Sequence, residues 1–183
     1  MNKTSVNGFR PEEITGTINA LLDNPELAKF KFRAKNKWVT GGHNQATIKS
    51  FYGVGMEDTS RDKAWVLDNG EPPVLLGNNE GANPVEYLLS ALSGCMTTTM
   101  ALHAAARGIE VESIESSYEG DLNVMGFLGL DDSVRNGYQE IRVTFNIKGS
   151  LSEEQKQEMI MFARKSPVYD VVTNGTKVDI SLA

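Results

Sequence analysis

The stretch that decides the fold is Asn83-Pro84-Val85-Glu86-Tyr87-Leu88-Leu89-Ser90-Ala91-Leu92-Ser93-Gly94-Cys95. It begins as helices do, with proline at the first helical position, and its apolar residues recur at helical spacing. The pattern continues to Arg107, and Gly108 is suited to end it. The sequence therefore predicts a helix over residues 84–107, the longest in the chain, with a thiol about three turns from its start.

Cys95 is the only cysteine in the chain. A lone thiol cannot form an internal disulfide, so it is either inert packing or a reactive group that needs an outside partner. The positions three, four and seven residues away are occupied by Leu88, Ala91, Leu92, Thr98, Thr99 and Leu102. This spacing predicts that Cys95 lies on a buried stripe of the helix, and both readings of the thiol stay open.

Before this helix, the pattern predicts a helix over 11–23, a half-buried strand over 28–39 and a turn over 40–44. Residues 45–53 alternate and are expected to pair with the first strand as a hairpin. Two short apolar runs, 64–67 and 73–76, follow, and residues 77–82 have the composition of a loop.

After the helix, residues 109–122 are expected to form a strand, 120–137 a surface excursion and 141–147 the clearest strand in the chain. Ser152 and Gln155 form a capping-box pattern for a helix that runs to about Lys165. Ser166-Pro167 interrupts that helix, and residues 178–182 alternate as a final strand. Because helices and strands do not alternate regularly, the predicted class is α+β.

Composition limits the partners. The 183 residues carry a formal charge of −6, and 40% of them are apolar. With no run of Lys or Arg longer than two, neither nucleic acid nor a membrane is the expected partner. The start lacks the apolar core of a signal peptide, and no segment approaches the ~18 apolar residues of a membrane span. A single cysteine fits a reducing compartment, so we expect a cytoplasmic protein.

The chain resembles the OsmC/Ohr family of thiol-dependent hydroperoxide-processing proteins. The resemblance is carried by Asn83-Pro84 with Cys95 eleven residues after the proline, by Glu86-Tyr87-Leu88-Leu89, by Leu92-Ser93-Gly94-Cys95, and by Ser166-Pro167-Val168. It covers roughly residues 29–182. It implies an OsmC-like fold, with antiparallel sheets around a long central helix, in an intertwined homodimer with sites at the subunit interface. The expected organisation is a helical extension over 1–27 and an OsmC-like domain over 28–183.

The resemblance assigns roles residue by residue. Cys95 matches the family's attacking cysteine, whereas Ser166 stands where the second, resolving cysteine would be. The chain thus resembles the subgroup that lacks this second cysteine. His43 follows a Gly-Gly turn where the family has an arginine. Val85 occupies the usual glutamate position, and Glu86, one place later, matches a spacing found in the broader group.

The candidate catalytic residues are therefore Cys95, His43 and Glu86. His43 can form a Cys–His pair, as base and then as acid, or be an ordinary turn residue. Glu86 lies nine residues before Cys95, on the opposite helix face and about 13 Å along the axis, so it reaches the thiol only across subunits or through another residue. Otherwise it is a favourable first-turn carboxylate.

Two functions fit these residues. The first is a thiol-dependent peroxidase that reduces organic hydroperoxides with one peroxidatic cysteine, recycled by an external thiol, in oxidative stress defence. The alternative is a non-catalytic dimer that binds a small apolar ligand in its interface pocket. No cofactor is expected, and one cysteine and two histidines without close spacing give little to build a metal site on.

Overall fold

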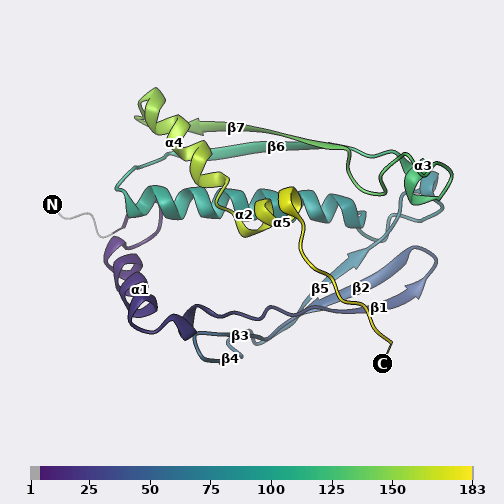
Figure 1. The fold of residues 1–183 in the computed structure, drawn as a ribbon, viewed down its shortest axis with the longest axis horizontal. Helices are drawn as coiled ribbons and strands as arrows, with labels where there is room; N and C mark the ends of the chain where they lie inside the picture. The colour runs from purple at the N-terminus through teal and green to yellow at the C-terminus, as the bar shows by residue number, and fades with distance from the viewer. Residues whose placement is uncertain (1–4, 183) are drawn as a thin grey trace. The chain divides into compact units, whose positions relative to one another are not determined.

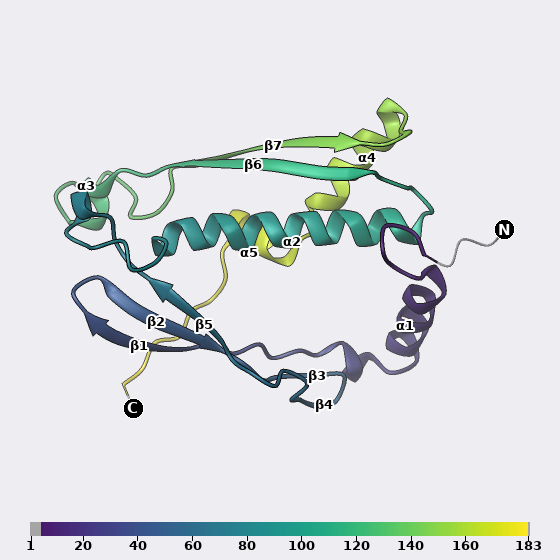
Figure 2. The same ribbon diagram turned by 180° about the vertical axis from the view of Figure 1, so that it is seen from behind.

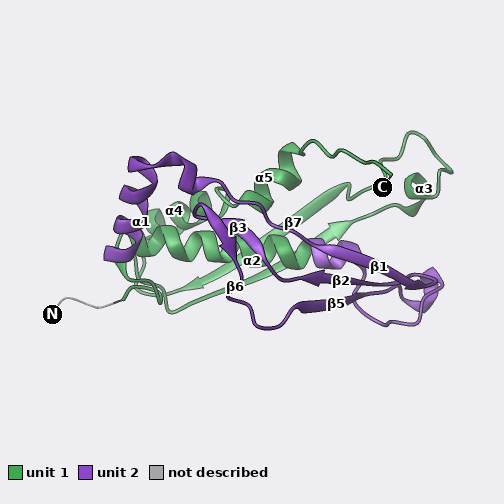
Figure 3. Cartoon of the chain, turned by 90° about the horizontal axis from the view of Figure 1, so that it is seen from below, with its two compact units in different colours: residues 1–11, 89–183 green, residues 12–88 purple. Residues whose placement is uncertain are grey.

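The computed structural model describes residues 5–182, which form two compact units (Figure 3). Unit 1 comprises Met1–Pro11 and Leu89–Ala183, and unit 2 comprises Glu12–Leu88. Residues 1–4 of the predicted N-terminal extension, and residue 183, lie outside the described residues. The boundary predicted at residue 27 stays a prediction.

The long helix α2 spans Pro84–Ala106 and confirms the sequence prediction. Asn83 caps its start, since its Oδ1 accepts from the Val85 amide at 2.9 Å. At the other end the Ile109 amide donates to the Ala104 carbonyl at 2.9 Å. This closing bond needs a left-handed residue before Ile109, and Gly108 supplies it with φ 68°.

In unit 1, α2 runs along the hairpin of β6 (Ser113–Asp121) and β7 (Glu140–Lys148), as Figure 1 shows. The two strands pair antiparallel from Ser113↔Lys148 to Asp121↔Glu140. Alternate side chains of β7 face α2. Residues of α4 (Glu153–Ala163) and α5 (Pro167–Asn174) contribute to the same core. The buried core consists of Leu92, Met96, Met100, Ala104, Ile109, Met159, Phe162 and Ala163. The short helix α3 (Val124–Phe127) lies in the predicted excursion.

Asn7 links the segment before α1 to the residues that follow α2. Asn7 donates through Nδ2 to the Ile109 carbonyl at 2.8 Å and accepts through Oδ1 from the Val111 amide at 3.0 Å. Val6 beside it is buried. The segment before the first helix is thus hydrogen-bonded to the turn that follows α2.

Unit 2 contains α1 (Pro11–Asp23), the 3-10 turns η1 (Pro25–Ala28) and η2 (Pro73–Leu75), and five short strands. β1 (Lys35–Thr40), β2 (His43–Ile48) and β5 (Trp65–Asn69) form an antiparallel sheet in the order β1-β2-β5. β3 (Phe51–Gly53) and β4 (Met56–Asp58) form a separate hairpin, visible in Figure 2. Helices and antiparallel sheets confirm the α+β class.

Two predicted strands need new bounds. The strand expected over 28–39 begins only at Lys35, because Phe30 and Phe32 stack on Phe51 instead of facing a core. The strand expected over 45–53 begins earlier, at His43, which the turn was expected to hold. It is also split after Ile48, and its second part pairs with β4.

The predicted final strand is wrong. Residues 175–182 form no helix or strand, and the alternating Val178, Ile180 and Leu182 are all exposed. A strand needs a hydrogen-bonding edge beside it, and no described strand pairs with this segment. The sequence also left α5 unpredicted, although its Ser-Pro start is a recognised helix beginning.

The described residues contain no helix that is both long and apolar enough to span a bilayer.

Candidate functional site

Cys95 lies in the middle of α2 and is half-buried rather than buried. The core covers the neighbouring stripe of the helix, which carries Leu92, Met96, Met100 and Ala104. Cys95 belongs to a second stripe, here called the open stripe, formed by Leu88, Ala91, Cys95, Thr98 and Leu102. Its two leucines are 38% and 37% exposed.

Within the single chain, the stripe predicted to be buried around Cys95 is therefore open, for a geometric reason, and its cover by a second subunit stays a prediction. The β6–β7 hairpin and the helices packed on it cover one face of α2, and a step of about 100° per residue carries Cys95 away from its buried neighbour Met96. The half-buried thiol lies on the same helix face as the partly exposed Leu88 and Leu102.

His43 begins β2 and is hydrogen-bonded to Asp68 on the adjacent strand β5. Its Nε2 lies 2.8 Å from Asp68 Oδ1, with the two side chains 17% and 42% exposed. Gln45, two residues further on the same strand face, donates to the same oxygen at 2.9 Å. The side chain of His43 is therefore fixed by a hydrogen bond. It lies in a strand and is largely buried, so His43 is not an ordinary exposed turn residue.

Both the main chain and the side chain of Asp68 are fixed by hydrogen bonds. Register places it directly opposite Gln45, and its carbonyl accepts from the Tyr87 hydroxyl at 2.9 Å. A Cβ added to Gly81 would come within 1.8 Å of that carbonyl oxygen, so the loop passes too close for any larger residue. The His43 hydrogen bond, followed by that of Gln45, holds the pKa of the Asp68 carboxyl below its usual range.

Glu86 completes the cap of α2. Its Oε2 accepts from the Asn83 amide at 2.9 Å while Asn83 caps the first turn, the reciprocal arrangement of a capping box. Glu86 also borders a hollow of about 270 Å³ with Pro72, Asn79, Gly81, Asn83 and Val85. The structure therefore gives Glu86 a structural task at the helix start, and its catalytic role stays a prediction.

Ser166 is fully buried and is the N-cap of α5. Its Oγ accepts from the Tyr169 amide at 3.1 Å, and its own amide donates to the Ala163 carbonyl at 3.1 Å. The residue that stands in place of a resolving cysteine thus stabilises the break between two helices.

The four predicted site residues fall into two groups. Cys95 and Ser166 belong to unit 1, and His43 and Glu86 belong to unit 2. No hydrogen bond or ion pair joins any two of the four within residues 5–182. The residue that sequence reasoning missed is Asp68, because only the pairing of β5 with β2 brings it to His43.

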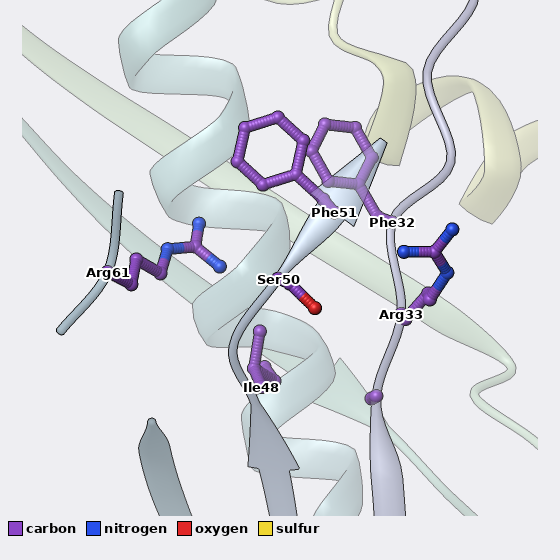
Figure 4. Close-up of a pocket in the computed structure, with 7 residues that line it drawn as sticks. Phe32, Arg33, Ile48, Ser50, Phe51 and Arg61 are labelled. Atoms are coloured by element: carbon purple, nitrogen blue, oxygen red, sulfur yellow. The ribbon is translucent and has the colours of Figure 1, made fainter. Parts of the chain in front are cut away.

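A larger hollow, of about 440 Å³, lies elsewhere in unit 2 (Figure 4). Phe32 and Phe51 lie side by side over it, with Ile48 below and an arginine on each flank. Arg33 is neutralised by a two-bond contact to Glu57, whereas the Arg61 guanidinium lies 5.4 Å from the Phe51 ring centre. None of the predicted catalytic residues borders this hollow.

The second histidine has a packing role. His103 stacks on Phe162 in the unit 1 core, with ring centres 5.4 Å apart. Burial, followed by the charges of Lys165 and Arg107, lowers the pKa of His103 below its usual value. Within the described residues, no three His, Cys, Asp or Glu side chains gather closely enough to hold a metal ion.

Solved structures of other proteins share this fold. An OsmC-like protein from Mycoplasma pneumoniae is 19% identical and superposes with a TM-score of 0.60 over 84% of this chain and 96% of its own. An organic hydroperoxide resistance protein OsmC from Legionella pneumophila is 16% identical, with a TM-score of 0.53 over 79% of this chain and 91% of its own. Sequence identities this low show a shared fold alone. No curated protein matches the chain.

The sequence signature described as OsmC-like protein matches residues 77–181, which hold the whole of α2 and the core packed on it. This match covers more than half of the chain, so the protein belongs to the OsmC-like family.

Proposed function

We propose that this protein reduces organic hydroperoxides with Cys95 as its single peroxidatic cysteine and an external thiol as reductant, in defence against oxidative stress. The observation that carries the proposal is the place of Cys95, a half-buried thiol on the apolar open stripe of α2. A fully buried thiol would be out of reach of a peroxide, and a fully exposed one would lack the apolar surface that favours an organic substrate.

The reaction needs three steps. The Cys95 thiolate attacks the outer oxygen of the hydroperoxide, the O–O bond breaks, and the departing alkoxide takes up a proton to leave as an alcohol. Cys95 becomes a sulfenic acid. One external thiol then condenses with it and releases water, and a second thiol breaks that mixed disulfide, which returns the Cys95 thiol and yields a disulfide of the reductant.

The composition supports an external reductant. Cys95 is the only cysteine, and the position of the resolving partner is filled by the buried cap Ser166. No second thiol of the same subunit is present to close a disulfide.

His43 is the proposed proton carrier. An ordinary cysteine thiol, with a pKa of about 8.5, is only a few per cent thiolate at pH 7, so a base that accepts its proton raises the rate. The same imidazole can then return the proton to the departing alkoxide.

The name of the Legionella relative, an organic hydroperoxide resistance protein, supports organic hydroperoxides as the substrate class.

We also propose that the protein works as a homodimer. Several large apolar side chains of unit 2 are exposed, among them Phe32, Trp38, Trp65 and Val66. Together with the open stripe of α2 they present the kind of apolar surface that subunit contacts cover. Sedimentation equilibrium at micromolar concentration tests this: a dimer is expected, and a monomer at every concentration contradicts it.

Peroxide consumption by the reduced protein tests the catalytic proposal. We expect turnover of an alkyl hydroperoxide only with an added thiol, measured over a panel of small-molecule thiols and dithiol proteins. Cys95→Ser is expected to abolish turnover, while the control Thr98→Ser, one turn away on the open stripe, keeps it. Full activity in the Cys95 variant would rule out the proposal.

The alternative, a non-catalytic ligand carrier, is favoured by the apolar hollow beside Phe32 and Phe51. It predicts that apolar ligands bind equally well to wild type and to the Cys95→Ser variant, with no peroxide turnover in either. Calorimetric titration with apolar ligands, beside the turnover assay, separates the two functions.

A further inference from the structure

The contacts around His43 carry an inference that rests on the proposed function and adds a residue to it. We propose that Asp68 is the positioning residue of the reaction: it holds His43 in the tautomer protonated at Nε2 and leaves Nδ1 as the atom that exchanges the proton with the reacting groups.

The first step of the argument is the charge state of Asp68. Its Oδ1 accepts a hydrogen bond from Gln45 Nε2 at 2.9 Å and lies 2.8 Å from His43 Nε2. An aspartate with an ordinary pKa of about 3.9 is ionised at neutral pH, and the Gln45 donor favours the ionised carboxylate further. A carboxylate is an acceptor only, so the proton in the 2.8 Å contact resides on Nε2 of His43.

The second step concerns the other ring nitrogen. A neutral imidazole protonated at Nε2 has its lone pair on Nδ1. Among the described residues, none forms a hydrogen bond to Nδ1 of His43. This nitrogen is therefore the one available to take a proton from a thiol, and a doubly protonated His43 would give the proton back from the same atom while the carboxylate stabilises its charge.

The third step is the rigidity of Asp68 itself. Its main chain is fixed by the register with β2, by the Tyr87 hydroxyl bond and by the close passage of Gly81. A positioning group acts only if its own place is determined by its surroundings, and Asp68 meets this condition on three sides.

Glu80 is another carboxylate whose charge interacts with His43, but its oxygens accept hydrogen bonds from Asn78. It therefore serves as a control that removes a neighbouring negative charge and leaves the His43 contact intact.

The experiment compares Asp68→Asn with Glu80→Gln in the full chain. The first readout is the 15N shifts of the His43 ring in NMR spectra near neutral pH, which report the tautomer without any substrate. Wild type and Glu80→Gln are expected to show a single tautomer protonated at Nε2. Asp68→Asn is expected to show a mixture, because an amide offers both a donor and an acceptor.

The second readout is thiol-dependent peroxide turnover across pH. Asp68→Asn is expected to lower kcat/KM by about tenfold or more and to alter the pH profile, since general acid–base catalysis contributes on the order of 10²–10⁴-fold. A merely structural role would leave the profile unchanged. Asp68→Glu, which keeps the charge, is expected to recover part of the activity.

The two readouts separate the possible failures. A wild-type protein without thiol-dependent turnover overturns the proposed function, and with it any role of Asp68 in that reaction. An unchanged His43 tautomer in Asp68→Asn overturns the positioning by Asp68, whatever the activity. If Asp68→Asn changes the His43 tautomer but keeps wild-type turnover and pH profile, the positioning role of Asp68 is overturned as well. The orientation of His43 would then not matter for the reaction.

Discussion

The middle of α2 and the β2–β5 strand pair place their reactive groups in opposite ways. Cys95 sits on an open stripe, with its position determined by the helix alone. His43 is held by a carboxylate on a neighbouring strand, which is itself held by a tyrosine hydroxyl and a glycine loop. In the proposed reaction the nucleophile must stay accessible and the proton carrier must keep one orientation, and the two regions suit these different needs.

The comparison predicts different sensitivities to substitution. Changes on the open stripe should alter chemistry or assembly with little effect on folding, because few atoms pack there. Changes around Asp68 should affect stability and chemistry together, because the same contacts serve both.

Among variants that keep the thiol, the largest effect is expected for the histidine. His43→Gln should lower kcat/KM for an alkyl hydroperoxide by about 10²-fold or more, since it removes the group that carries the proton. The control is His103→Gln, which changes the other histidine, stacked in the core on Phe162. A loss in the control as large as in His43→Gln would contradict a specific role for His43.

Two glycines give the sharpest contrast in stability. Gly81→Ala forces a Cβ against the Asp68 carbonyl and should lower the free energy of unfolding by about 1–3 kcal/mol. Gly94→Ala, beside Cys95, meets no atom within 4 Å and should raise it by about 0.5–1 kcal/mol. Urea denaturation of both variants checks the pair, and equal effects would contradict the contrast.

The buried helix cap is expected to contribute less. Ser166→Ala removes the acceptor of the Tyr169 amide and should lower the free energy of unfolding by about 1–2 kcal/mol. Ser152→Ala, at the exposed cap of α4, is the matched control and should cost only about 0.5–1 kcal/mol. Thermal unfolding of the two variants measures the difference, and a larger loss at Ser152 would contradict the assignment.

The smallest effect is one of pH. Hydrogen bonds from His43 and Gln45 lower the pKa of Asp68 in the folded protein. Such a group adds stability that is present above its ordinary pKa of about 4 and is lost as the pH falls through the folded-state value. The slope of stability against pH below about pH 4 should therefore be shallower in Asp68→Asn, and an unchanged slope would count against the hydrogen bonds.

The sequence predicts well those parts of the fold that depend on local pattern. The start of α2 at Pro84 and its length follow from its own residues, and its end follows from Gly108 just beyond it. The alternation of residues in β7 likewise predicts that strand. Cys95 could be singled out because it is the only thiol and lies in a family motif.

The remainder depends on which elements come together. The failed final strand has the same alternation as β7, but no described strand offers it an edge. Asp68 lies in a short apolar run with no motif, and only register with β2 brings it to His43. Likewise the face of α2 that stays open is decided by where the β6–β7 hairpin packs, which helical spacing alone does not determine.

The central claim, that Cys95 is the peroxidatic group, is tested most directly by trapping its oxidised form. The reduced protein would be treated with one equivalent of an alkyl hydroperoxide in the presence of dimedone, which labels sulfenic acids but not oxidised methionines, and mapped by peptide mass spectrometry. We expect one dimedone adduct, on Cys95, that is absent without peroxide and absent when an excess of thiol is added before the dimedone. A thiol that remains unmodified after the peroxide has been present for many minutes would contradict the claim.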